Sequence, residues 1–197
     1  MGVTAERFAS GLTYQQYKDQ MTRNRDRLEA NETAFSVSEA ELAPFRVLAN
    51  PVNVLVLAED WCGDVIANLP VLGRIAAASG KLNVRVFLRD QNLDIMDQYL
   101  KQGQFRSIPV FVVFDEHFNE LGRFIERPDS VTELLSRKRA EIFARSPEFG
   151  SPTAPIDQLP EDVRNRLMTA MAAMRREIAP ESNAAVVREL AAIVGRA

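Results

Sequence analysis

The most restrictive feature of this 197-residue chain is its single cysteine, Cys62. One thiol cannot form an intrachain disulfide or a cysteine-based zinc cage, so a disulfide-stapled secreted scaffold is excluded. Such cysteine usage is typical of the reducing cytosol, and we expect a cytoplasmic protein. Any disulfide chemistry of this chain requires a second thiol from another molecule.

Composition and charge narrow the classes of partner. The chain is 46% hydrophobic and 26% charged, as in ordinary globular proteins. A net charge of −3 offers no basic surface for nucleic acid or for an anionic membrane, and we expect neither as a partner.

The first residues lack the layout of a signal peptide, and the longest apolar stretch, residues 52–58, is far shorter than the roughly 18 residues of a membrane span. One histidine and one cysteine argue against a protein-only transition-metal site, and we expect no metal and no cofactor.

Hydrophobic periodicity predicts alternating strands and helices in the middle of the chain. The expected strands are Val52 to Leu57, Val84 to Leu88, Val110 to Phe114 and Leu121 to Ile125, and the expected helices are Asp64 to Ser79, Leu93 to Leu100 and Val131 to Phe143. A turn at Asp115 to Asn119 makes the last two strands a hairpin. This order favours an α/β fold with a central mixed four-stranded sheet flanked by helices.

Helical patterns precede and follow this block. Thr13 with Gln16 and Ser38 with Glu41 have the spacing of capping boxes, and the first of them opens a helix that the apolar period carries to Leu28. We therefore divide the chain into an N-terminal helical extension (1–50), a central domain (51–145) and a C-terminal helical extension (146–197).

The C-terminal extension contains a long apolar stripe that Pro180 is expected to end, with a second helix after it. Such a stripe is most often core packing, and it is less often a dimer interface. A homodimer through the terminal helices stays open at this point. The stripe consists of Leu159, Val163, Leu167, Met171, Met174 and Ile178.

Cys62 stands where the first strand runs into its helix. A sulfur at a helix N-terminus faces unpaired backbone N–H groups and the positive end of the helix dipole, and both favour the thiolate. Cysteines in this position can have a lowered pKa and act as nucleophiles near neutral pH. The alternative is a buried and inert cysteine, which is a poor match to neighbouring Trp61 and Gly63.

Three motifs in order resemble the thioredoxin superfamily over residues 52–128. Trp61-Cys62-Gly63 follows a hydrophobic strand, Pro70 lies inside the next helix, and Ser107-Ile108-Pro109 opens a later strand. The resemblance implies a thioredoxin fold, a cis peptide bond before Pro109 beside Cys62, and a backbone there that binds extended peptide or glutathione-like substrates. It places the substrate-binding site at Trp61, Gly63, Asp64, Arg106, Ile108 and Pro109, with Cys62 as the catalytic residue.

Two departures from the superfamily pattern bear on the chemistry. Val65 stands where the Cys-x-x-Cys motif has its second thiol, and Val56 stands where the superfamily has a buried acidic residue. An aliphatic side chain cannot transfer a proton, so reduction of protein disulfides by the two-cysteine route is not expected. The run Glu-Asp-Trp-Cys-Gly-Asp resembles a thioredoxin-like subgroup in which the second cysteine is often replaced.

Three other residues could assist Cys62. Arg106 precedes the Pro109 loop and could stabilise a thiolate or hold a substrate carboxylate, although the position favours an ordinary surface arginine. Asp64 could cap the helix, but its charge opposes the thiolate. His117 would lie roughly 15 Å or more from Cys62 on the expected fold, so it is interpreted as a turn residue.

Two functions remain open at the level of sequence. The first is monothiol redox chemistry in cell redox homeostasis, with Cys62 forming mixed disulfides with a low-molecular-weight thiol or a protein thiol or disulfide. The second is a non-catalytic interaction module that uses the groove around Trp61 and Pro109.

Overall fold

The computed structural model describes residues 2–197, which divide into two compact units. The first contains the described residues through Pro128 together with Val186–Ala197, and the second contains Asp129–Ala185. The domain boundary expected at residue 145 lies inside the second unit, and the last residues of the C-terminal extension belong to the first. Among the described residues, no helix is long and apolar enough to cross a membrane.

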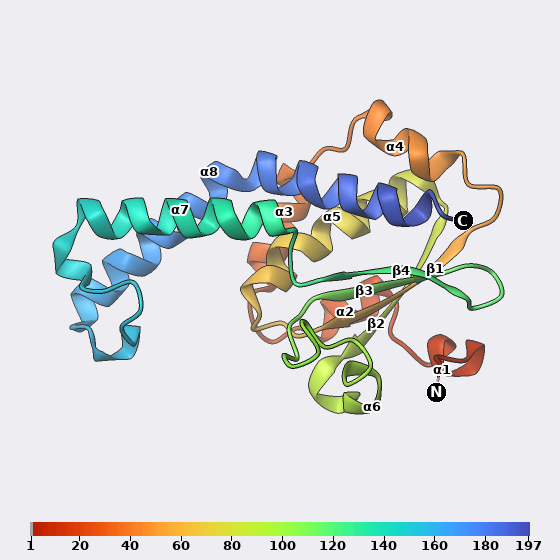
Figure 1. The fold of residues 1–197 in the computed structure, drawn as a ribbon, viewed down its shortest axis with the longest axis horizontal. Helices are drawn as coiled ribbons and strands as arrows, with labels where there is room; N and C mark the ends of the chain where they lie inside the picture. Colours follow the sequence, from red (N-terminus) through yellow and green to blue (C-terminus); the bar gives the residue numbers. More distant parts are fainter. Residues whose placement is uncertain (1) are drawn as a thin grey trace. The chain divides into compact units, whose positions relative to one another are not determined.

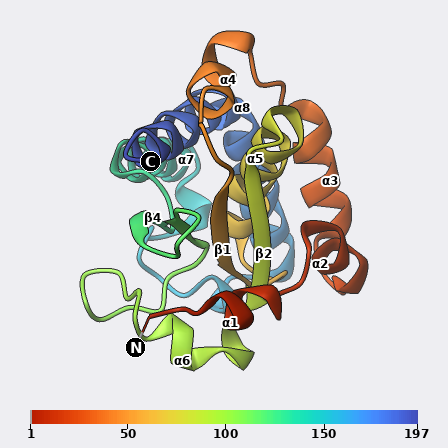
Figure 2. The ribbon, with the colours of Figure 1, turned by 90° about the vertical axis from the view of Figure 1, so that its right-hand side faces the viewer.

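The first unit is built on a four-stranded sheet in the order β2-β1-β3-β4 (Figures 1 and 2). The strands are β1 (Val52–Ala58), β2 (Leu82–Leu88), β3 (Val110–Phe114) and β4 (Glu120–Ile125). β1 pairs in parallel with β2 and antiparallel with β3, and β3 pairs antiparallel with β4. The mixed sheet, the hairpin and the strand positions confirm the fold predicted from the sequence.

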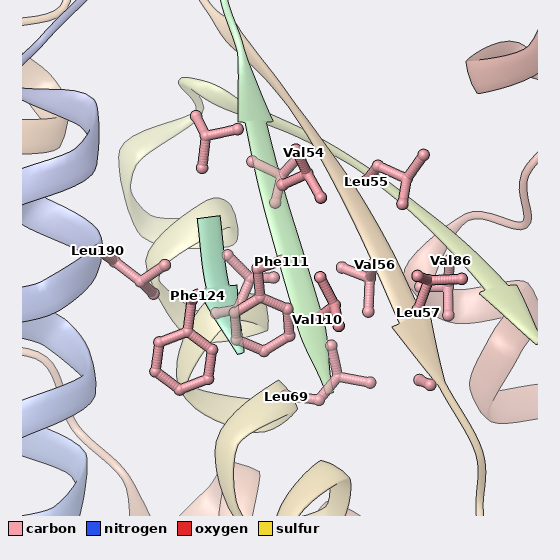
Figure 3. Close-up of a cluster of buried hydrophobic side chains, with 14 of the residues drawn as sticks. Val54, Leu55, Val56, Leu57, Leu69, Val86, Val110, Phe111, Phe124 and Leu190 are labelled. Carbon is pink, nitrogen blue, oxygen red and sulfur yellow. The ribbon is translucent and has the colours of Figure 1, made fainter. Parts of the chain in front are cut away.

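The core forms around β1 because the strand is apolar nearly throughout and its neighbours cover it. Phe111 of β3 and Phe124 of β4 stack with their ring centroids 4.9 Å apart. Leu190, near the end of α8 (Glu161–Val194), lies beside this pair (Figure 3). The end of α8 thereby completes the hydrophobic core of the first unit.

The N-terminal segment forms four helices among the described residues: α1 (Ala5–Ala9), α2 (Tyr14–Gln20), α3 (Arg25–Ala34) and α4 (Glu39–Arg46). Both capping boxes are present, at Thr13 and at Ser38. The single helix expected to extend to Leu28 is wrong, because the chain leaves the helical conformation between α2 and α3. The carboxylate of Asp60 accepts hydrogen bonds from the backbone N–H groups of Thr22 and Arg23. These hydrogen bonds stabilise the non-helical conformation of the segment between α2 and α3.

An extended segment before α2 lies along the free side of β2. Leu12 and Val86 exchange two backbone hydrogen bonds, of 2.9 and 2.7 Å. Gly11 permits this approach, since a Cβ atom there would lie 2.6 Å from the ring of Phe87. The N-terminal extension therefore contributes directly to the sheet of the first unit.

After β1 comes the helix α5 (Gly63–Ser79), with Cys62 as its N-cap residue and Gly80, which has a left-handed φ of 65°, as its C-cap residue. A short 3-10 helix, η1 (Arg89–Gln91), and α6 (Leu93–Met96) connect β2 to β3. α6 is shorter than the expected helix because turns replace its second half. Pro70 lies inside α5 and is buried.

The second unit consists of α7 (Asp129–Arg145), the N-terminal part of α8 and the 3-10 turns η2 (Pro147–Phe149) and η3 (Ile156–Gln158). The apolar stripe of α8 packs against its own chain: Met174 and Ile178 contact Leu134, and Leu167 packs with Phe143 and Phe149. The stripe is therefore core packing, and a homodimer through the terminal helices stays a prediction.

The expected break at Pro180 is wrong, because α8 continues through it. A proline inside a helix costs about 3 kcal/mol, since it removes one backbone donor and crowds the preceding turn. Buried apolar residues on both sides offset that cost, with Ile178 before Pro180 and Val186 after it.

Candidate functional site at Cys62

Cys62 is the N-cap residue of α5. β1 ends at Ala58, and the loop that follows turns so that the backbone N–H of Cys62 donates to the carbonyl of Glu59 at 3.2 Å. The Cys62 carbonyl accepts the first helical hydrogen bond, from Ile66, at 3.1 Å. The thiol thus lies at the start of the helix, as the sequence predicts, and the backbone N–H groups of Asp64 and Val65 interact with it.

The loop before β3 forms the other side of the site. The Ile108–Pro109 peptide bond is cis, as the resemblance implies. The Cys62 thiol donates to the carbonyl oxygen of Ile108, with a distance of 3.4 Å between Sγ and O. Cys62 therefore meets the Ile108–Pro109 peptide, which lies more than 40 residues later in the sequence.

The environment raises the pKa of the Cys62 thiol, in contrast to the lowered pKa expected from the sequence. Burial is the largest cause, because it disfavours the charged thiolate. The backbone N–H groups of Val65 and Asp64 lower the pKa, the Asp64 carboxylate raises it, and Arg127 lowers it. The helix N-terminus acts in the expected direction, but burial outweighs it.

Arg106 does not lie against the Cys62 sulfur as a thiolate partner. Its guanidinium forms a two-point ion pair with the carboxylate of Asp97, at 2.7 and 2.9 Å, on an exposed surface. The Arg106 carbonyl accepts a hydrogen bond from Arg89 at 3.1 Å, and Arg89 lies over the Trp61 ring, 4.9 Å from its centroid. Arg106 is thus a surface arginine paired with Asp97, which is one of the alternatives considered from the sequence, and its backbone contributes to the loop beside Trp61.

The cation that interacts with Cys62 is Arg127, which the sequence analysis missed. Its guanidinium donates to both carboxylate oxygens of Asp64, through Nε at 3.2 Å and through Nη2. The same Nη2 lies 2.6 Å from Glu126, whose other carboxylate oxygen lies 2.6 Å from the Lys101 ammonium. The only signal in the sequence was an arginine at the end of the hairpin, and its partner stands 63 residues earlier.

Asp60, two residues before Cys62, forms hydrogen bonds that fix the loop before α5. One carboxylate oxygen accepts from the Thr22 N–H at 2.8 Å, the Thr22 hydroxyl at 3.2 Å and the Arg23 N–H at 2.9 Å. The Asp60 carbonyl accepts from the side-chain amide of Asn24 at 2.9 Å. Asp60 thus connects the Cys62 loop to the segment between α2 and α3.

The other residues singled out in the sequence take the expected places. His117 lies in the exposed turn between β3 and β4, at the end of the sheet opposite to Cys62, since Phe114 pairs with Asn53 at the start of β1. Val56 and Val65 are fully buried. Within residues 2–197, no group of three or more His, Cys, Asp or Glu side chains is arranged to hold a metal ion.

A mixed four-stranded sheet with a cysteine at the start of the helix after β1, facing a cis-proline, defines a protein of the thioredoxin fold. The sequence profile of the thioredoxin family matches residues 11–141, and the chain belongs to this family. No curated protein matches the chain.

Two solved structures share the fold over nearly their whole length. An HIV epitope-scaffold protein superposes with a TM-score of 0.64 at 17% identity, covering 100% of this chain and 99% of the other. A protein of unknown function from Pseudomonas aeruginosa superposes with a TM-score of 0.62 at 19% identity, covering 90% of this chain and 99% of the other. At these identities the likeness concerns the fold alone.

Proposed function

We propose that the protein is a monothiol exchange protein in which Cys62 forms mixed disulfides with a glutathione-type thiol or a protein thiol. The observation that carries the proposal is the position of the sulfur, at the N-terminus of α5 and 3.4 Å from the Ile108 carbonyl beside cis-Pro109. A substrate chain that binds the backbone of this loop would have its own disulfide next to Cys62.

The exchange needs two steps and an external thiol. The Cys62 thiolate attacks one sulfur of a disulfide RS–SR′, the Cys62–SR bond forms, and R′S⁻ leaves and takes up the proton that Cys62 released. A second thiol, R″SH, then attacks the mixed disulfide as its thiolate, forms RS–SR″ and returns Cys62 to the thiol. Cys62 is neither oxidised nor reduced over the cycle.

The raised pKa of Cys62 limits the rate of this exchange at neutral pH. Only the thiolate is the nucleophile, and the thiol form predominates below the pKa. The thiolate that does form is intrinsically more nucleophilic than one of low pKa, which offsets part of the loss. We therefore expect exchange that accelerates steadily with pH and reaches no plateau at neutral pH.

Incubation of the full chain with oxidised glutathione tests the proposal. Mass spectrometry should detect one glutathione adduct on Cys62, formed faster at higher pH and removed by added reduced glutathione. Cys62→Ser should form none. Absence of an adduct on the folded wild-type protein at pH 8.5 would overturn the proposal.

A non-catalytic binding module is the second candidate, and the exposure of two aromatic side chains favours it. Trp61 is 44% exposed and Phe105 is 54% exposed, and both belong to loops that meet at the site through Arg89. Exposed aromatic residues are enriched in binding surfaces. Binding of a partner that survives Cys62→Ser but not Trp61→Ala would support this function over thiol exchange.

A further inference from the structure

Two charged side chains pair with each other at the start of α5 and act in opposite directions on the Cys62 thiol, whose pKa Asp64 raises and Arg127 lowers. Asp64 lies in the first turn of α5, and Arg127 follows the end of β4. Their side chains are only 13% and 18% exposed, so solvent screens their charges incompletely. We propose that the Arg127–Asp64 pair sets the reactivity of Cys62, with Arg127 as a positioning residue that offsets the Asp64 charge beside the sulfur. This inference deepens the proposed function, since it concerns the regulation of the same nucleophile.

The backbone holds Arg127 in place from two directions. The backbone N–H of Glu126 donates to the carbonyl of cis-Pro109 at 2.7 Å. The side-chain amide of Asn68, a buried residue of α5, donates to the Glu126 carbonyl at 2.8 Å. The residue just before Arg127 is therefore tied both to the loop that faces the thiol and to the helix that carries it.

The ion pair with Glu126 holds the guanidinium of Arg127 in place. Nη2 is shared between the carboxylates of Asp64 and Glu126, and Lys101 compensates the charge of Glu126 at 2.6 Å. We expect Arg127 to remain bound to Glu126 when the Asp64 charge is removed. Arg127 should then still lower the pKa of the Cys62 thiol, while the opposing effect of Asp64 is lost.

The other titratable groups near Cys62 come from three elements and are unchanged in the variants below. Tyr17 of α2 is 1% exposed, its hydroxyl has no hydrogen-bond partner among the described residues, and burial raises its pKa, so it stays neutral. Further charged groups of this region are Glu59 and Asp60 of the preceding loop, which act on Tyr17, and Arg89 of η1, which lies over the Trp61 ring.

Two variants of the pair should shift the reaction in opposite directions. The measurement is the rate of iodoacetamide alkylation of Cys62 across pH. Asp64→Asn should raise the rate at pH 7.5 by roughly threefold to tenfold and move the pH profile to lower pH. Arg127→Gln should lower the rate by a similar factor and move the profile to higher pH, since the positive charge of Arg127 no longer offsets the Asp64 charge.

Controls separate this effect from a change in stability. Arg123→Gln removes an arginine of β4 that is paired with the carboxylate of Glu120 at 2.9 Å, and it should leave the profile unchanged. Arg127→Lys should restore most of the wild-type rate. Circular dichroism checks folding, and if Arg127→Gln does not fold, Asp64→Asn and Arg127→Lys still give the result.

An unchanged profile in Asp64→Asn, or a shift to higher pH, would overturn the inference. Alkylation does not depend on disulfide exchange, so the two proposals can fail separately. Shifted profiles without a glutathione adduct would refute thiol exchange alone, and an adduct with unshifted profiles would refute the role of the pair alone.

Discussion

Two aspartates stand two residues before and two residues after Cys62, and their surroundings differ completely. Asp60 is bound by backbone N–H groups and a hydroxyl of the segment between α2 and α3, and no cation pairs with it in the described hydrogen bonds and ion pairs. Asp64 is bound by Arg127 and interacts electrostatically with the sulfur. The first carboxylate fixes the position of the loop, and the second affects the charge of the thiol. Equal distance from a nucleophile in the sequence therefore does not imply an equal role.

The largest effect should come from Asp60→Ala. The variant loses three hydrogen bonds to a charged acceptor and leaves two backbone donors without it. Because these bonds are exposed to solvent, we expect the free energy of unfolding to fall by no more than about 2 kcal/mol. Urea denaturation measures this, and Asp60→Asn, which keeps one acceptor oxygen, should lose less. If the pH profile of Cys62 alkylation in Asp60→Ala shifted as far as in Asp64→Asn, the two aspartates would not have the different roles inferred for them.

Val65→Cys tests the region after Cys62 by supplying the missing second thiol. Val65 lies in the first turn of α5, and its backbone N–H interacts with the Cys62 sulfur, so the two side chains start close together. We expect insulin-disulfide reduction near background for the wild type and at least about tenfold above it for the variant, since an internal thiol resolves the mixed disulfide. Cys62→Ser in the Val65→Cys background is the matched control. Substantial turnover by the wild type would show that a resolving thiol is not required.

Asn24→Gly should have a smaller effect on the region before Cys62. Asn24 has a left-handed φ of 55°, and its amide donates to the Asp60 carbonyl at 2.9 Å. Glycine adopts the same φ without strain, so the variant removes this hydrogen bond and the exposed one that Asn24 Oδ1 accepts from Arg27 at 3.0 Å, and it should cost about 1 kcal/mol. Urea denaturation of the single variant and of the combination with Asp60→Ala would show whether the two residues act together. Strictly additive losses would show that the two side chains hold the loop independently, because Asp60→Ala keeps the carbonyl that Asn24 binds, and an unchanged free energy of unfolding in Asn24→Gly would contradict the prediction.

The smallest effect that we expect is the contribution of the Cys62 thiol to the pH dependence of the free energy of unfolding. Its pKa is higher in the folded protein than in an exposed cysteine, so the thiol stabilises the fold fully below the unfolded pKa of about 8.5. That contribution is lost as the pH rises through the folded pKa. The wild type should therefore lose stability relative to Cys62→Ser above about pH 8.5, and both proteins share the buried tyrosines, whose effect cancels in the difference. A wild type that gains stability there would contradict the raised pKa.

The sequence predicted the sheet and the position of Cys62 well, because both depend on local patterns. Alternation of apolar strands with a helical period located β3 at Val110–Phe114 and the end of α5 at Gly80. The break between α2 and α3 was not predicted, since it depends on Asp60, more than 35 residues away. Arg127 was missed for the same reason, and Arg106 was preferred because it stands nearer to Pro109 in the sequence.

The direction of the Cys62 pKa was also beyond a local argument. The helix N-terminus is visible in the sequence, but burial depends on how the loop before Pro109 covers the sulfur. The continuation of α8 through Pro180 was likewise not visible locally. The residues that offset the cost of the proline are buried in two separate clusters, Ile178 in one and Val186 in the other. In each of these places tertiary contacts decided between two locally acceptable outcomes.

The backbone pairing of Leu12 with Val86 has a consequence for association between copies of the chain. β2 is at the edge of the sheet, and an edge strand exposes unpaired N–H and C=O groups that can recruit a strand from another molecule. Leu12 occupies both groups of Val86 near the middle of that edge. The N-terminal extension therefore interrupts the β2 edge as a template for strand addition, and a chain that lacked the extension would expose a longer continuous edge at β2.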